Sequence, residues 1–145
     1  MTPRTSRRLL PLVLICLGTA TAAPDERGYK VIVHPDNPIT AVDRDFLRDA
    51  YLKKSTVWRE GQTIRPIDLS TRFPQRVRFV EEVVRKTPSQ LKSYWNQQIF
   101  SGKGVPPPEA DSAAAVVDYV VANPGAIGYV PASIDAGRAK VVKVR

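Results

Sequence analysis

A short polar turn in the middle of the chain has the residue types of a small anion-binding site. Ser70, Thr71 and Arg72 directly precede an amphipathic segment that begins near Phe73. The start of a helix carries unpaired N–H groups and a partial positive charge, and both favour a bound anion. Hydroxyl groups add donors, and an arginine can hold a phosphate or a carboxylate through two hydrogen bonds. We therefore expect an oxyanion site here. The alternative is that Ser70 or Thr71 simply caps the helix while Arg72 lies in solvent.

Asp68 stands two residues before this turn and also has two interpretations. As a hydrogen-bond acceptor it could recognise the proton of a monohydrogen phosphate, whereas its charge would repel a fully ionised anion. The alternative is a loop carboxylate that caps the turn. The candidate ligand-binding residues are therefore Asp68, Ser70, Thr71 and Arg72.

The remaining chemistry-bearing residues do not predict catalysis or a metal site. His34 is the single histidine and follows an apolar strand, where it is either a ligand contact or, in the simpler interpretation, a solvated loop residue. A metal site needs several such ligands. The chain has no nucleophile elbow, phosphate-binding P-loop or dinucleotide fingerprint. We expect a protein that is not an enzyme and that uses no cofactor.

The first 23 residues have the pattern of a secretory signal peptide. Three arginines precede the apolar run Leu9–Leu17, which is too short to span a bilayer, and small residues follow. We expect cleavage after Ala23, with Ala20 and Ala22 as alternatives. The exported product is then periplasmic or secreted, and no later apolar run is long enough to cross a membrane.

Residues 24–145 have the length of one domain. Removing the signal peptide takes three of the 22 basic residues and none of the 14 acidic ones, which lowers the net charge from +8 to +5. This charge suits an anionic ligand or surface, but export and the lack of aromatic–basic interleaving argue against nucleic acid. We interpret Arg76 and Arg78 as part of a solvated face, although they could also steer anions.

The elements alternate in an order that is typical of an α/β fold with a central sheet flanked by helices. Proline at the first helical position and a capping box over residues 87–90 give the strongest helix start. The expected elements are strand Tyr29–Val33, a helix after Asp43, strand Thr63–Leu69, helices beginning near Phe73, after Thr87 and after Ser112, and strands Ala126–Val130 and Lys140–Val144.

Aromatic residues and glycines in these elements have structural interpretations. Trp58, Tyr94 and Trp95 could form an aromatic platform for a ligand, but core packing is the simpler prediction. Gly125 is expected to end a helix, and Gly128 to let something approach the backbone of a strand closely. That something is either a ligand or a neighbouring helix.

Three stretches resemble the substrate-binding proteins of phosphate-type ABC transporters, within the type 2 periplasmic-binding-protein superfamily. They are NPITAVDRDFLRDAYLKKSTVWREGQTIRPID, LKSYWNQQIFSGKG and VVDYVVANPGAIGYV. The similarity runs from Tyr29 to Ser133. It implies a mixed sheet flanked by helices, like one lobe of a type 2 periplasmic binding protein, an exported protein, phosphate as the ligand and a transporter permease as a partner.

Two departures from the family pattern bear on function. Members are about twice as long and bind their ligand between two lobes, so this chain resembles one lobe, and a homodimer could restore a two-sided cleft. The family also places an Arg and a Ser-Gly-Thr turn after the strand that ends here in Asp68. The segment Asp68–Phe73 keeps the hydroxyls and an arginine in a changed order, without the glycine.

Two functional hypotheses therefore remain. The first is an exported solute-binding protein that takes phosphate or a similar small oxyanion. The second is a ligand-free protein-interaction or envelope-accessory module derived from the same fold.

Overall fold

The computed structural model describes residues 26–145, so the predicted signal peptide lies outside the described part. Its main sheet has five strands in the order β2-β7-β1-β6-β3. β1 pairs antiparallel with β6 and β7, whereas β2 and β3 pair parallel with β7 and β6. This confirms the predicted α/β fold with a mixed sheet. The strands are β1 (Tyr29–Val33), β2 (Ala41–Val42), β3 (Arg65–Pro66), β6 (Ala126–Pro131) and β7 (Lys140–Val144).

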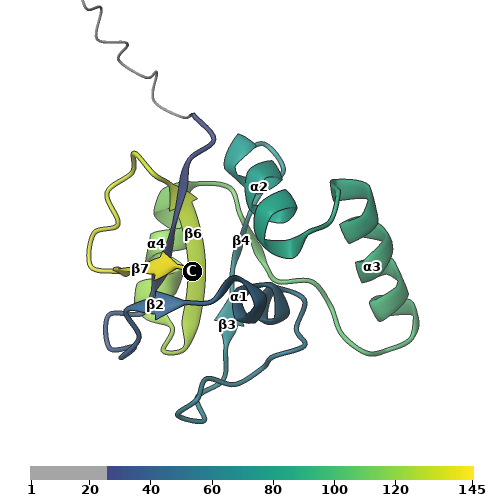
Figure 1. Cartoon of the computed structure of the whole chain (residues 1–145), viewed down its shortest axis with the longest axis horizontal. Coiled ribbons are helices and arrows are strands. Elements are labelled where there is room, and N and C mark those ends of the chain that lie inside the picture. Colours follow the sequence, from purple (N-terminus) through teal and green to yellow (C-terminus); the bar gives the residue numbers. More distant parts are fainter. Residues whose placement is uncertain (1–25) are drawn as a thin grey trace, which may run out of the picture.

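Helices cover both faces of this sheet (Figure 1). Successive side chains of a strand point to opposite faces, so neighbours on β6 meet different helices. A side chain at Gly128 would meet Val116 of one helix, and Tyr129 stacks on Phe79 of another. The helices are α1 (Arg44–Tyr51), α2 (Pro74–Phe79), the π-helix η1 (Val80–Val84), α3 (Pro88–Phe100) and α4 (Ala113–Ala122).

Two of the predicted helix starts are formed as expected. Thr87 and Gln90 exchange both hydrogen bonds of a capping box at the start of α3. Ser112 accepts a hydrogen bond from the backbone N–H of Ala115 and so caps α4. Asp43 is the N-cap residue of α1, but its side chain makes no capping bond.

The predicted strand over residues 63–69 is divided, because the chain changes partner after Ile67. The N–H of Ile67 donates to Ile127 in the main sheet, at 2.9 Å, whereas that of Asp68 donates to Pro108, at 2.9 Å. Pro66 has no N–H, so a proline here favours an interrupted ladder. The second piece, β4 (Asp68–Leu69), pairs with β5 (Glu109–Ala110) in a small parallel sheet of its own. This change of partner positions the candidate site.

The glycines in and before β6 serve backbone packing. A β-carbon on Gly128 would lie 2.7 Å from Val116 Cγ1, so the neighbour that approaches this strand is helix α4. Gly125 has a φ of +83° and directly faces the carbonyl oxygen of Thr63. Trp58 and Trp95 are buried, as the core interpretation predicts.

Candidate anion-binding site

The segment from Ser70 to Phe73 forms a turn between β4 and α2. The N–H of Ser70 donates to the carbonyl of Ala110, at 3.0 Å, and the N–H of Phe73 donates to the carbonyl of Ser70, at 3.1 Å. Helix α2 has Phe73 as its N-cap residue and no side-chain capping bond. The prediction that Ser70 or Thr71 caps the helix is therefore wrong, and their hydroxyl groups are not used in that way.

Ser70 is buried, and its hydroxyl has no hydrogen-bond partner among the described residues. Leaving a buried hydroxyl unpaired costs about 1–3 kcal/mol, so nearly all buried polar groups are paired. The Ser70 hydroxyl is therefore a spare donor, but it is enclosed by the fold. A ligand at the turn reaches it only if the turn opens.

Thr71 and Arg72 are exposed at the tip of the same turn. The Nη2 of Arg72 lies 3.1 Å from the carbonyl oxygen of Asp111 and 3.3 Å from its carboxylate. Both side chains are largely in solvent, and a surface pair of this kind contributes about 0–1 kcal/mol. An anion could therefore replace Asp111 on the guanidinium at little cost.

Asp68 is buried and has a partner on each carboxylate oxygen. The Tyr129 hydroxyl donates to Oδ1, and Arg76 Nε donates to Oδ2 at 3.1 Å. Burial raises the pKa of Asp68, while Arg76 and the Tyr129 hydrogen bond oppose that increase. Asp68 is thus neither a loop residue nor open to solvent.

Aromatic side chains enclose this carboxylate. Tyr129 stacks on Phe79 with ring centres 3.9 Å apart, and the Tyr51 hydroxyl donates to the carbonyl of Ile67 at 2.8 Å. A cavity of about 10 Å³ borders Asp68, which is close to the lower limit for one water molecule. No phosphate fits on this side of Asp68 without movement of the chain.

Arg76 is the residue that the sequence interpretation missed. Its side chain is only 15% exposed and lies between Asp68 and Glu109, with Nη2 3.2 Å from the Glu109 carboxylate. The prediction that Arg76 belongs to a solvated face is therefore wrong. An arginine in the first turn of α2, eight residues after Asp68, was the available signal, but it required knowing where α2 begins.

The other predicted candidates lie elsewhere. His34 is in contact with the start of β6, because its N–H donates to the carbonyl of Ala126 at 3.4 Å. Its side chain is 12% exposed and its Nδ1 accepts from the N–H of Asp36, so the solvated interpretation is wrong.

Residues 26–145 contain no cluster of three metal-ligating side chains. Within the same range, no helix has the length and apolar character needed to cross a bilayer.

Several solved structures share this fold. A substrate-binding protein of the phosphate ABC transporter type, solved with bound phosphate from Clostridium perfringens, matches with a TM-score of 0.62 at 23% identity over 81% of this chain. An ABC-type phosphate transport receptor from Vibrio cholerae matches with a TM-score of 0.62 at 19% identity over 81% of this chain. PstS from Borrelia burgdorferi gives 0.57 at 16% identity, again over 81%.

The likeness establishes the fold. It confirms the resemblance to one lobe of a phosphate-type binding protein, because the chain spans only 44%, 46% and 47% of the length of these three structures. No family model and no curated protein sequence matches the chain.

Proposed function

We propose that this protein is an exported binding lobe that takes a small oxyanion, phosphate first, at the turn Ser70–Arg72. The observation that best supports this proposal is the buried, unpartnered hydroxyl of Ser70, which lies next to two exposed donors, Thr71 and Arg72. Side chains supply most of the proposed contacts, because Pro74 opens the helix and contributes no N–H. The shared fold with phosphate-binding proteins supports the choice of phosphate.

Asp68 is the fourth proposed contact and has a conditional role. Both of its oxygens have partners, so it can accept the proton of a monohydrogen phosphate only by giving up Tyr129 or Arg76. If Asp68 keeps both partners, it does not contact the ligand, and its role is to position Arg76 and to fix β4 beside the turn. The two roles predict different results, because only direct contact makes binding depend on the protonation of phosphate.

The turn is open on its outer side, so we expect weak binding with a dissociation constant on the order of millimolar, about −4 kcal/mol. A second surface would strengthen it. A homodimer or a transporter permease could supply that surface, since the fold's relatives are about twice as long as this chain.

Isothermal calorimetry with sodium phosphate at fixed ionic strength tests this function. The unaltered protein should release saturable heat, Arg72→Ala and Ser70→Ala should weaken binding, and Arg138→Ala on a distant loop should not. A protein that gives no heat up to tens of millimolar phosphate, on the scale of the expected affinity, does not bind the ion, and the proposal then fails.

One observation favours the second hypothesis, a protein-interaction module. Phe100 is 96% exposed at the end of α3, and the preceding Ile99 is more than half exposed. Two adjacent large apolar side chains left in solvent are a feature that an interaction site would explain. Size-exclusion chromatography separates the two hypotheses. Dimers that form only with phosphate support solute binding, whereas a Phe100-dependent dimer or complex that ignores phosphate supports the interaction module.

A further inference from the structure

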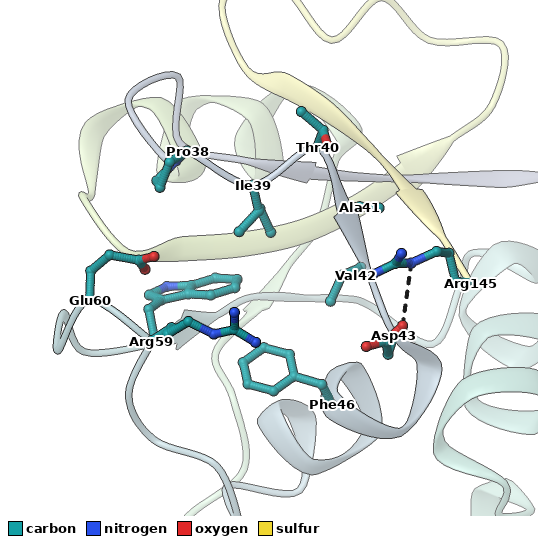
Figure 2. A pocket seen from close by; sticks show the side chains of 11 residues that line it. Pro38, Ile39, Thr40, Ala41, Val42, Asp43, Phe46, Arg59, Glu60 and Arg145 are labelled. Carbon is teal, nitrogen blue, oxygen red and sulfur yellow. Dashed lines mark ion pairs between the residues drawn. The ribbon is translucent and has the colours of Figure 1, made fainter.

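A second concave site lies beside the edge strand β2, in a different part of the molecule from the Ser70 turn. It is a pocket of about 400 Å³ between β2, the start of α1 and the loop that precedes β3. Figure 2 shows the side chains around it, with β2 on one side and Phe46 of α1 below. Its volume falls in the lower part of the range for small-ligand pockets, about 300–1,000 Å³.

The apolar wall of this pocket is fixed in place. Phe46 and Trp58 pack with ring centres 5.5 Å apart. The indole N–H of Trp58 donates to the carbonyl of Gly125 at 2.9 Å, and its backbone N–H donates to Gln62 at 2.7 Å. Ile39 completes the wall. Trp58 is only 4% exposed and supports Phe46 from behind, so a ligand would meet mainly the half-buried side chains of Phe46 and Ile39.

The strand at the side of the pocket has a free edge. β2 pairs only with β7 in the main sheet, through bonds in which Lys143 and Arg145 donate to the carbonyls of Thr40 and Val42, each at 3.0 Å. Backbone groups alternate in direction along a strand, so the N–H and C=O of Ala41 face away from β7. An unpaired strand edge next to side-chain pockets is the arrangement that binds extended peptide backbone.

Charges of both signs at the rim remain available. Asp43 and Arg145 pair with each other at 3.4 Å. Arg59 and Glu60 are exposed and form no ion pair with any residue of the described range 26–145. In Figure 2, Arg59 reaches toward Phe46 while Glu60 lies on the side of Pro38. A ligand with one anionic and one cationic group complements this rim.

We infer that the pocket binds a free peptide of two or three residues with apolar side chains. Its main chain pairs with Ala41, an apolar side chain lies on Ile39 and Phe46, and its carboxylate and ammonium groups meet Arg59 and Glu60 respectively. A single amino acid carries both charges but has no peptide group left to pair with the backbone of Ala41. The inference does not depend on phosphate binding, because the two sites share no residue.

A nuclear magnetic resonance titration of the full protein with trileucine tests the inference. We expect saturable shifts of the Ala41, Arg59 and Glu60 amides and of the Trp58 indole, with the Trp95 indole unmoved. Arg59→Ala and Glu60→Gln should each raise the dissociation constant about fivefold, as for a surface charge pair. Arg138→Ala and Glu81→Gln, which change the same charges elsewhere, should not.

Blocked trileucine, with an acetylated amino end and an amidated carboxyl end, distinguishes a free peptide from an internal segment of a longer chain. Loss of binding on blocking supports a free peptide. Equal or tighter binding of the blocked peptide identifies an internal segment of a longer chain and overturns the inference. Absence of shifts at these four positions with either probe overturns it as well, and a normal spectrum of each variant shows that the fold is intact.

Discussion

The hydroxyl of Tyr129 donates to Asp68, and this bond ties the central strand β6 to the short strand β4. Asp68 in turn accepts from Arg76 of α2 at 3.1 Å, so one buried carboxylate joins three elements next to the Ser70 turn. The proposed anion site depends on this connection, because β4 belongs to a separate two-stranded sheet. The Asp68–Arg76 pair links β4 to α2 through side chains.

Tyr129→Phe should destabilise the protein by about 1.5–3 kcal/mol, since it removes a hydrogen bond to a charged and buried group. Urea unfolding followed by circular dichroism measures the change. Tyr119→Phe is the control, because Tyr119 is only half-buried and its side chain does not contact Asp68. Equal small effects of both substitutions would show that the bond to Asp68 contributes nothing to stability.

Arg76→Met should cost about 3 kcal/mol at neutral pH, because it leaves the buried carboxylate of Asp68 without its cation. Burial already raises the pKa of Asp68, and losing Arg76 raises it further. A raised pKa in the folded state means that stability is retained below the pKa of unfolded aspartate, about 3.9, and is lost as pH rises through the folded pKa.

The destabilisation by Arg76→Met should therefore shrink as the pH falls toward 4. Arg72→Ala provides the matched comparison, since its exposed pair with Asp111 is worth about 0–1 kcal/mol. A loss of stability at Arg76 that does not vary with pH would place its effect in packing and would separate it from Asp68.

Ser70→Ala should change stability and binding in opposite directions. The substitution removes a buried hydroxyl without a partner, so the free protein should become more stable by about 1 kcal/mol. Phosphate binding should weaken at the same time, because the proposed site loses a donor. Thermal unfolding with and without phosphate measures both effects. A variant that loses stability would show that the hydroxyl is paired in solution.

Gly128→Ala should be destabilising by about 1–3 kcal/mol, because the added carbon would lie 2.7 Å from Val116 Cγ1 and 3.0 Å from Ile67 Cγ2. Gly104→Ala is the control, since nothing lies within 4 Å of its added carbon. The double variant with Val116→Ala should recover part of the loss. If it recovers none, the cost arises from the strand backbone and not from contact with α4.

The tyrosines predict a loss of stability in alkali. Burial and the nearby Glu82 raise the pKa of Tyr29 to about 12, and burial followed by Asp68 raises the pKa values of Tyr51 and Tyr129 well above 10. Unfolded tyrosines ionise near about 10, so this stability is present below that pH and is lost as the pH rises toward 12.

Absorbance and circular dichroism recorded together check this prediction. We expect ionisation of the buried tyrosines to coincide with unfolding in one step. Ionisation of every tyrosine near pH 10 with the circular dichroism unchanged would contradict the burial of Tyr51 and Tyr129.

Sequence reasoning predicted the features that local chemistry decides. The capping box of Thr87 and Gln90 is a property of four neighbouring residues, and the glycine inside a strand at position 128 signals a close approach whatever residue makes it; both predictions are confirmed. The resemblance to phosphate-type binding proteins predicted the fold. It could not supply the change of partner between Ile67 and Asp68, because that depends on residues 108–110 passing beside the strand.

The candidate site also combines features that the sequence predicted with features that it did not. Ser70 and Arg72 lie on one turn, as their adjacency requires, whereas the burial of Asp68 and Arg76 follows from contacts with Tyr129 and Glu109 that are distant in sequence. The π-helix after Phe79 also escaped prediction, because its apolar residues fit an ordinary helix equally well. Long-range contacts thus decided which polar residues are buried.

The most direct test of the proposed anion site is a phosphate titration followed by nuclear magnetic resonance of backbone amides. We expect saturable shifts centred on Ser70, Thr71 and Arg72, with loss of these shifts in Arg72→Ala and none with chloride at equal ionic strength. Shifts that never saturate, or that centre on another part of the surface, would contradict it.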